Sequence, residues 1–458
     1  MSKKKPCGKL VFLDNNGTTL ISPEAEKVYS KWLKCYNPSS DSKISKESRE
    51  IVDKSRGYIQ KLYNAGNYEV IFTSGATESN CFILRSSVES YKKRMGVKPH
   101  VVVSAVEHHS VLECCDMLEK YEYAEVTKVQ PNIYGNILPG DVKRSIKSNT
   151  CLISIMYANN ELGALNNIPE IGKIAHENGI PLHSDCVRMI GKYNLDLEKN
   201  NVDAISASFH KFHGPKGIGL LLIKRNFLNG YELDGQINGS QQHGLRGGTE
   251  NVPAIASGVE ALKHSMKTRD TKNKRIRGLR DKLIVKLSKA IKPENYQDYV
   301  NKDPPQGTHL VILGPPVDKP RYYIGNTLLF AVANTEKEVC NVAIKKELDK
   351  KGVVVSISSA CLTSSPKASH VLDAIMAPPI IKRGVFRISF SDQSRETDVN
   401  TFMREFVKIL KDQGHLRTRK ASVKSQKKDA SKKKSSSKKE RKESKEKKES
   451  KTKKNSKK

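Results

Sequence analysis

The sequence has no long apolar run and no cysteine spacing that is typical of a zinc site. The apolar stretch at residues 219–223 is far shorter than the roughly 20 residues that a membrane-spanning helix needs. The nine cysteines are odd in number and include no CxxC pair, so neither a disulfide framework nor a metal centre is predicted. Residues 1–5 are charged but no apolar segment follows them, so no signal peptide is predicted. We therefore expect a protein of the reducing cytoplasm that does not enter a membrane.

Acidic residues are scarce relative to basic ones. The 458 residues include 81 Lys and Arg but only 49 Asp and Glu, which gives a net charge of +32. The segment 417–458 alone contains 21 Lys and Arg against 5 acidic residues. Such a Lys/Ser-rich segment cannot bury enough apolar surface to offset its ordering entropy, so a disordered tail is predicted. Three roles stay open for it, namely solubility, contact with nucleic acid or an acidic partner, and a nuclear-import address.

Apolar runs alternate with amphipathic stretches over roughly the first 260 residues. This alternation predicts an α/β fold with a mostly parallel sheet and helices on both of its faces. Strands are expected at residues 69–73, 100–104, 151–156, 204–207 and 217–223, and helices at 76–90, 111–121 and 168–178.

A charged helical segment at 256–292 leads to a second region with fewer strands. There we expect strands at 328–332, 353–356 and 385–389, which predicts a smaller α+β domain. The length suffices for two hydrophobic cores. The predicted organisation is an N-terminal arm (1–20), a large domain (21–260), a small domain (261–415) and the basic tail (416–458).

A lysine and an acid in the predicted large domain suggest a specific cofactor chemistry. Lys211 lies in a glycine-bordered loop, and Asp185 lies upstream after an apolar stretch. A pyridoxal phosphate (PLP) enzyme requires this pair, because the lysine binds the cofactor as a Schiff base and the carboxylate keeps the pyridine nitrogen protonated. Alone, a lysine in a loop is more often simply solvated.

Other polar residues follow the predicted strands. Gly75 precedes a helix whose first N–H groups, those of Ala76 and Thr77, would point at an anion, although an ordinary N-cap turn explains this stretch equally well. His108 and Asn160 end the next two predicted strands. Ligands of open α/β sheets bind at the carboxyl ends of the strands, so we expect these residues to meet Asp185 and Lys211 at one edge.

With these motifs in place, the chain resembles the NifS-type cysteine desulfurases, class V aminotransferase relatives of PLP fold type I. The resemblance covers roughly residues 10–412 and includes FLDNNGTT at 12–19, NPSS at 37–40, SAC at 359–361 and RIS at 387–389. It implies a PLP-binding large domain, a small domain with a reactive cysteine, and a homodimer.

The resemblance also implies residue roles. Lys211 would bind PLP covalently, Asp185 would pair with the pyridine nitrogen and His108 would stack on the ring. Asn160 would lie near the phenolic oxygen, and Arg387 would clamp the substrate carboxylate. The phosphate would be held by Thr77, Ser208, His210 and, from the neighbouring subunit, Thr249.

Cys361 would attack the sulfur of bound L-cysteine, become a persulfide and leave alanine. This chemistry needs a thiolate on a mobile segment, and small polar residues surround Cys361 on both sides. A buried structural thiol is the usual fate of a cysteine, but a serine-rich loop fits burial poorly.

Three departures from the family stand out. Arg188 occupies the place of a glutamine that helps to bind the phenolic oxygen of PLP; its guanidinium would stabilise the phenolate or turn away. Phe209 replaces a small residue between Ser208 and His210. The basic tail replaces the C-terminus on which related enzymes dock an iron–sulfur scaffold, which leaves the sulfur-acceptor protein open.

The sequence therefore predicts a PLP-dependent cysteine desulfurase. One alternative is another PLP reaction, by a selenocysteine lyase or an aminotransferase, although a Ser-Ala-Cys loop argues against the latter. A second alternative is a catalytically weak scaffold whose tail binds nucleic acid.

Overall fold

A seven-stranded sheet forms the larger half of the fold in the computed structural model, which describes residues 10–357 and 369–417. Strand β8 is antiparallel to both of its neighbours, and the other strands run in one direction. The mostly parallel sheet expected from the sequence is thus confirmed. In spatial order the strands are β2 (Tyr68–Thr73), β8 (Gly219–Lys224), β7 (Ala204–Ser208), β6 (Leu182–Asp185), β5 (Thr150–Ser154), β3 (His100–Ser104) and β4 (Glu125–Val129).

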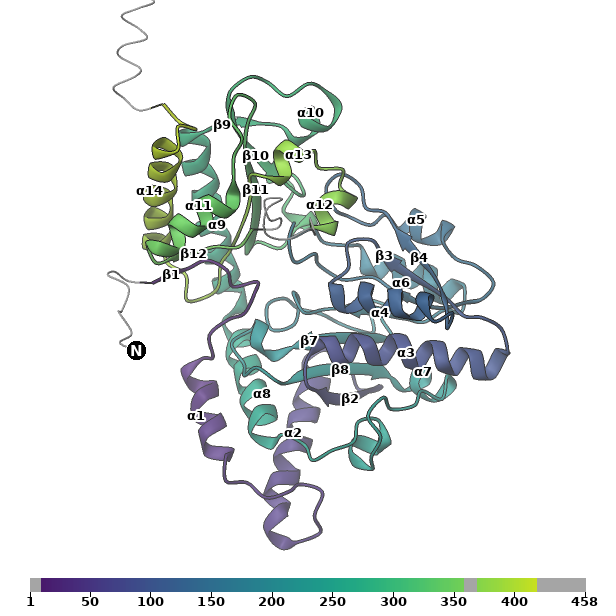
Figure 1. Ribbon diagram of the computed structural model, residues 1–458. Coiled ribbons are helices and arrows are strands. Elements are labelled where there is room, and N and C mark those ends of the chain that lie inside the picture. The colour runs from purple at the N-terminus through teal and green to yellow at the C-terminus, as the bar shows by residue number, and fades with distance from the viewer. Residues whose placement is uncertain (1–9, 358–368, 418–458) are drawn as a thin grey trace, which may run out of the picture. The chain divides into compact units, whose positions relative to one another are not determined.

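Helices cover both faces of this sheet because its buried strands are apolar on both sides. In β3, Val101 and Val103 belong to one hydrophobic cluster and Val102 belongs to the other. The first cluster includes side chains of α3 (Ala76–Met95), α4 (His109–Lys120) and α7 (Arg225–Gly230) (Figure 1). The second includes α1 (Pro23–Trp32), α2 (Lys46–Leu62), α5 (Pro139–Arg144), α6 (Ile168–Glu177) and α8 (Val252–Lys267).

A four-stranded sheet follows in the chain, in the order β13 (Val385–Ser389), β11 (Thr327–Asn334), β10 (Thr308–Leu313) and β9 (Lys292–Glu294). Its pairs are antiparallel except that β9 and β10 are parallel. The helices of this region are α9 (Arg269–Ala290), α10 (Tyr296–Asn301), α11 (Asn341–Lys350), α12 (His370–Ala374) and α13 (Pro379–Lys382). Short 3₁₀ turns occur at η1 (Lys43–Ser45), η2 (Phe209–Lys211), η3 (Gln241–Gly244) and η4 (Pro320–Tyr322).

Two predicted elements differ from the structure. The single helix expected at 256–292 is two helices, α8 and α9, which meet at Thr268 with non-helical backbone angles of φ −119° and ψ 11°. No glycine or proline marks this break, so no local signal in the sequence predicts it. The strand expected at 353–356 is shorter, because only β12 (Val353–Val354) pairs regularly and Ser356 forms an isolated bridge with Arg387.

The N-terminal segment connects the two sheets. Strand β1 (Val11–Phe12) pairs with β12, and Asp14 forms a bridge with Ser389 at the end of β13. The segment then returns to the large sheet, where the Thr19 amide donates to the His210 carbonyl at 3.0 Å. Figure 1 shows this purple segment passing from β1 down to α1. Residues 15–18 are thereby held over the loop that contains Lys211.

The described chain continues through α14 (Glu396–Asp412) to Arg417. Residues up to Arg404 form one compact unit, and residues from Glu405 belong to a second. Most of the predicted basic tail lies outside the described residues, and the predicted domain boundaries stay a prediction. None of the helices in the described part is both long and apolar enough to span a bilayer.

Candidate active site

A pocket of about 340 Å³ opens where the carboxyl ends of the large sheet meet the N-terminal segment and β13. Strand β2 and strand β7 both pair with β8, which places Thr73 and Ser208 on either side of Gly219 and brings the ends of both strands together. The pocket is lined by Asn16, Gly17, Ala76, Thr77, His108, Ser110, Met156, Asn160, Asp185, Val187, Arg188, Ser208, His210, Lys211 and Arg387. Most of the predicted site residues therefore lie around one cavity.

Lys211 ends the 3₁₀ turn that follows β7. Its amine donates hydrogen bonds to two backbone carbonyls of the N-terminal segment, those of Asn16 at 2.9 Å and Gly17 at 2.6 Å. Burial, together with the positive charges of Arg188 and Arg387, lowers the pKa of Lys211 to about 7. A substantial fraction of the amine is therefore uncharged near neutral pH, as a nucleophilic or proton-accepting lysine requires.

Asp185 is held by a buried amide network. Its Oδ2 accepts from Asn80 Nδ2 at 3.0 Å, and its Oδ1 accepts from the Val187 amide at 2.9 Å. Asn80 Nδ2 also donates to Ser110 Oγ at 2.9 Å, and this hydroxyl lies 2.9 Å from His108 Nδ1.

The network also assigns the tautomer of His108. Its Nδ1 accepts from the Ser110 amide at 3.2 Å and faces the Ser110 hydroxyl, so the ring proton lies on Nε2. Burial lowers the pKa of His108, and the positive charges of Lys211 and Arg188 act in the same direction. The ring is therefore a neutral, oriented surface beside Asp185.

The opposite end of the pocket is suited to an anion. The α3 N-terminus contributes N–H groups there, and the Ala76 amide donates to Ser208 Oγ at 2.8 Å. His210 Nδ1 lies 2.9 Å from Thr18 Oγ1, and burial lowers the His210 pKa to about 4. Strand β8 approaches Gly75 so closely that a Cβ on Gly219 would lie 2.4 Å from the Gly75 Cα.

Arg387 lies on β13 at the remaining side. Its Nη2 donates to Asp14 Oδ1 at 3.0 Å and to Ser356 Oγ at 3.2 Å, and its Nη1 lies 3.4 Å from the Asn160 carbonyl. The Nε atom is buried and has no partner among the described residues. The guanidinium is thus fixed by its neighbours on one side of the pocket that it lines, where a carboxylate could bind it.

Arg188 is 5% exposed and does not bind Asp185. Its Nη1 donates to Asn16 Oδ1 at 3.2 Å and its Nη2 to the Asn16 carbonyl at 2.7 Å. No carboxylate of the described residues forms an ion pair with it within 4.0 Å. The side chain therefore joins the N-terminal segment instead of being neutralised by the acid, and its buried Nε has no partner in the described chain.

The donor set fits PLP. The cofactor combines a phosphate, a pyridine nitrogen and an aldehyde, and the pocket offers a helix N-terminus with hydroxyl groups, a fixed carboxylate and a largely uncharged amine for these three groups.

Three predicted residues lie outside this arrangement. Thr249 is exposed and does not line the pocket of its own chain. Cys361 lies outside the described residues. Gly75 lies behind Ala76 and contributes through its close approach to Gly219 rather than as lining.

Phe209 points away from the pocket. It is fully buried, and its ring centroid lies 5.3 Å from that of Phe212 and 6.5 Å from that of Phe72. Gly258 of α8 provides the space, because a Cβ at that position would lie 2.4 Å from the Phe209 ring. The hydrophobic core therefore accommodates Phe209, which stands where the family has a small residue.

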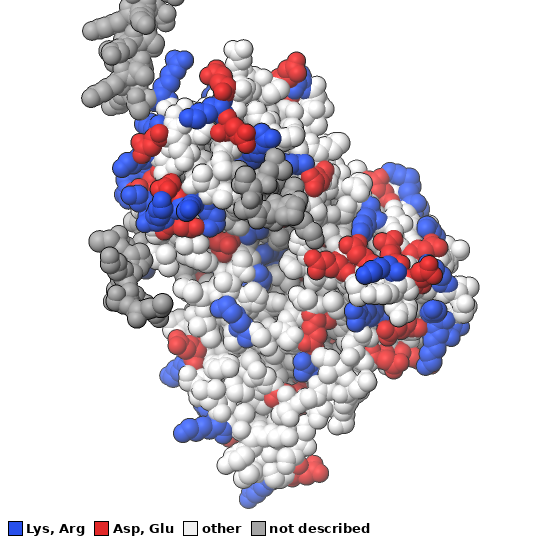
Figure 2. Space-filling view, in the orientation of Figure 1, with Lys and Arg blue, Asp and Glu red and all other residues white. Residues whose placement is uncertain are grey.

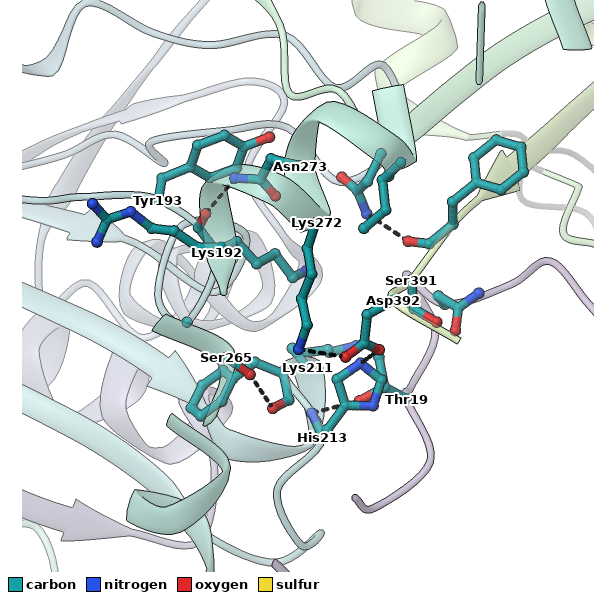
Figure 3. A pocket seen from close by; sticks show the side chains of 17 residues that line it. Thr19, Lys192, Tyr193, Lys211, His213, Ser265, Lys272, Asn273, Ser391 and Asp392 are labelled. Atoms are coloured by element: carbon teal, nitrogen blue, oxygen red, sulfur yellow. Dashed lines mark hydrogen bonds and ion pairs between the residues drawn. The ribbon is translucent and has the colours of Figure 1, made fainter. Parts of the chain in front are cut away.

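A second, smaller cavity of about 50 Å³ lies on another side of Lys211 (Figure 3). There Asp392 accepts from Lys272 Nζ at 2.9 Å and lies 2.6 Å from His213 Nε2. The His213 ring and the Lys272 ammonium lower the pKa of Asp392 against the opposing effect of burial. The loop that contains Lys211 continues to His213, and these pairs fix this part of the loop to Asp392 in the segment that follows β13.

Several residues that hold the side chains of the pocket in place were missed by the prediction from sequence. Asn16, Asp14 and Ser356 act through partners more than 30 residues away, so no local spacing reveals them. Asn80 had a signal, because it follows Thr77 by three residues and so lies close to it on the α3 surface.

Comparisons with known proteins agree with this geometry. The sequence pattern described as "Aminotransferase class-V" matches residues 11–312. The cysteine desulfurase IscS of Dictyoglomus turgidum is 34% identical over 403 residues, which are 87% of this chain and 94% of that protein. The IscS of Methanosarcina thermophila is 33% identical over 88% of this chain and 92% of its own length.

Solved structures show the same relationship. A NifS-like protein covers 88% of this chain and 100% of its own, with a TM-score of 0.75 and 28% identity. The NifS-like protein from Rickettsia africae gives a TM-score of 0.72 at 25% identity, with the same coverage. The chain belongs to the class V aminotransferase family, as a member of its NifS-type cysteine desulfurases.

Proposed function

We propose that this protein is a PLP-dependent cysteine desulfurase that converts L-cysteine to L-alanine and places the sulfur on Cys361. The proposal rests mainly on the placement of Lys211, Asp185 and Arg387 around one pocket. In that pocket the pKa of Lys211 is lowered to about 7. A desulfurase needs an amine, a ring-pairing acid and a carboxylate clamp at one site.

Each side chain has a defined task. Lys211 would hold the cofactor covalently, and its uncharged amine would accept a proton from the substrate Cα. Asp185 would pair with the pyridine nitrogen, and Arg387, which lines the pocket, would bind the substrate carboxylate. When bound, PLP withdraws electrons from the substrate, which weakens bonds at its carbon atoms.

Phosphate binding would fall to the α3 N-terminus, Thr77, Ser208 and His210. The neutral His108 ring, fixed through Ser110, would lie against the cofactor plane. Asn160, whose carbonyl binds Asn16 and Arg387, would lie near the phenolic oxygen. We further expect a homodimer, in which the exposed Thr249 reaches the phosphate of the neighbouring subunit.

The described residues on either side of the Cys361 segment support its role. On one side, Ser356 exchanges backbone hydrogen bonds with Arg387. On the other, His370 Nε2 lies 2.8 Å from the Glu107 carbonyl and Ser369 Oγ donates to Glu161 at 2.9 Å. Cys361 follows Ser356 by five positions, a span of at most about 17 Å. The thiol thus belongs to a segment that leaves from, and returns to, the rim of the pocket.

The transfer is balanced without another reactant. The Cys361 thiol forms an S–S bond to the substrate sulfur, the substrate C–S bond breaks, and the thiol proton replaces sulfur on the alanine carbon after relay through Lys211. A persulfide and L-alanine result. Release of sulfide then needs a reducing thiol, and a sulfur-acceptor protein would take that place in the cell.

The test measures alanine and sulfide from purified full-length protein supplied with PLP, L-cysteine and dithiothreitol. We expect one alanine per sulfide for the wild-type protein. Cys361→Ala should retain the cofactor absorbance and lose at least about 100-fold in sulfide release, since the acceptor thiol is gone. Cys35→Ala is the matched control, because Cys35 is half-buried and outside the pocket.

Sulfide release by Cys361→Ala at the wild-type rate would refute the persulfide step. Alanine production from selenocysteine but not from L-cysteine would instead identify a selenocysteine lyase. A protein that binds PLP and produces no alanine from either substrate would favour the scaffold alternative.

A further inference from the structure

Asn16 is the centre of the hydrogen-bond network around the catalytic lysine. It is 1% exposed, and each of its polar atoms has a partner. Its amide N–H donates to Ser389 Oγ at 2.8 Å, and its Nδ2 donates to the Asn160 carbonyl at 2.9 Å and to Thr327 Oγ1 at 2.8 Å. Such a side chain cannot rotate without losing several buried hydrogen bonds at once.

The Asn16 carbonyl has two cationic donors. Arg188 Nη2 approaches it at 2.7 Å and Lys211 Nζ at 2.9 Å. Arg188 also holds the Asn16 side chain through Oδ1 at 3.2 Å. The guanidinium therefore fixes the carbonyl that receives the lysine amine, and both cationic groups donate to the same oxygen atom.

We propose that Arg188 is a positioning residue for the catalytic lysine: it fixes the Asn16 carbonyl as a resting place for the Lys211 amine whenever that amine is not bound to the cofactor, and it presents a positive charge to the amine there. This inference rests on the proposed function, because a resting place matters only to a lysine that is released and rebound during turnover.

A glutamine at this position, as in related enzymes, would supply hydrogen bonds without a charge. An arginine adds a positive charge, because even with the effect of burial its pKa is about 9 and the group is protonated at neutral pH. Burial lowers the Arg188 pKa, with a further contribution from Arg387. No carboxylate of the described residues neutralises it within ion-pairing distance, so its field acts on Lys211.

The charged groups facing Lys211 are of both signs. Burial is the first cause of its lowered pKa, Arg188 the second and Arg387 the third, whereas Asp14 and Asp185 act in the opposite direction. The other titratable groups that interact with the amine are His108, His210 and Lys192. Removing the Arg188 charge should therefore raise the Lys211 pKa.

The test measures the pKa of Lys211 directly, in the full-length chain freed of cofactor with hydroxylamine. Brief labelling with acetic anhydride across a pH series, followed by peptide mass spectrometry, gives the midpoint at which Lys211 becomes reactive. We expect a wild-type midpoint near 7 and an increase of roughly one pH unit in Arg188→Gln. Arg188→Lys, which keeps the charge, should stay closer to the wild type.

Arg56→Gln is the matched control, because Arg56 is also largely buried but pairs with Glu250 and Asp53 away from the pocket. Thermal melts establish that each variant is folded. An unchanged Lys211 midpoint in a folded Arg188→Gln protein overturns the proposal, as does an equal shift in Arg188→Lys and Arg188→Gln.

This measurement requires neither cofactor nor L-cysteine. A failed desulfurase assay with a shifted Lys211 midpoint would count against the proposed reaction alone. A working desulfurase with an unshifted midpoint would count against the role of Arg188 alone.

Discussion

Glu107 has one carboxylate oxygen that is well bonded and one that is not. Oε1 accepts from Ser104 Oγ and from the Met156 amide, each at 2.6 Å, while the buried Oε2 has no partner among the described residues. Burial raises the pKa of Glu107 to about 8 from an ordinary value near 4.5. The side chain is therefore protonated at neutral pH, next to His108 at the edge of the pocket.

This residue predicts a pH dependence of stability. Between the ordinary and the raised pKa the folded state binds one proton more than the unfolded state, so the contribution of Glu107 is complete below about pH 4.5 and is lost as the pH rises through about 8. Glu107→Gln removes this titration. Urea unfolding from about pH 5 to about pH 9 should show the variant gaining stability relative to wild type as the pH rises.

A constant difference between Glu107→Gln and wild type would mean that the carboxyl is already ionised.

At this scale the sequence predicted those site residues that follow strands. Lys211, Asp185 and His108 each lie at or just after the carboxyl end of a strand, and the sheet brings such positions to one edge. Asn16 and Asp14 escaped prediction because their partners Ser389 and Arg387 are 373 positions away in the chain. Only the tertiary fold reveals that pairing.

At the scale of elements, helix α8 packs closely against the 3₁₀ turn that contains Phe209 and Lys211. Gly258 lies within α8, where an alanine normally favours the helix by about 1 kcal/mol. Here the added Cβ would lie 2.4 Å from Phe209 Cδ1, so we expect Gly258→Ala to destabilise the protein by about 1–3 kcal/mol through overpacking.

A double-mutant cycle isolates this contact. In the Phe209→Ala background the ring is absent, and Gly258→Ala should become neutral or stabilising in urea unfolding. Gly278 on α9 has no heavy atom within 4 Å of such a Cβ, so Gly278→Ala should stabilise both backgrounds. If Gly258→Ala lowers the free energy of unfolding equally with and without the Phe209 ring, the contact between the two residues does not explain the destabilisation.

Strands were predicted well where a run of apolar residues marks them and less well elsewhere. Residues 100–104 and 385–389 match β3 and β13, which are almost entirely buried. β4 was missed because it is an edge strand with the partly exposed sequence EVTKV. β6 was missed because LHSD is polar although every residue is buried, with His183 bonded to Ser154 and Ser206.

For the whole molecule, the charge is distributed unevenly along the chain. Figure 2 shows Lys and Arg interspersed with Asp and Glu over the visible face, with further basic side chains inside a hollow at its middle. The segment after Leu416 holds 21 of the 81 basic residues. We therefore expect it to act through electrostatic association and not through catalysis.

Deletion of the residues after Leu416 should leave dimerisation and desulfuration unchanged. It should weaken binding to a random RNA or DNA oligonucleotide, and the full-length protein should lose that binding steeply as salt increases. Fluorescence anisotropy at several salt concentrations measures both effects. Equal and salt-insensitive binding by the two proteins would dismiss a nucleic-acid role for the tail.

The pairing of the N-terminal segment with β12 and β13 affects how the chain folds during its synthesis. Residues 11–16 are synthesised more than 330 positions before their partners in β12 and β13. At roughly 5–20 residues per second, this segment waits on the order of tens of seconds for its partners. A nascent chain that ends before β13 has Lys211 but lacks Ser389 to fix Asn16 and Arg387 to close the pocket. We therefore expect chains that end before β13 to bind PLP more weakly than the full-length chain.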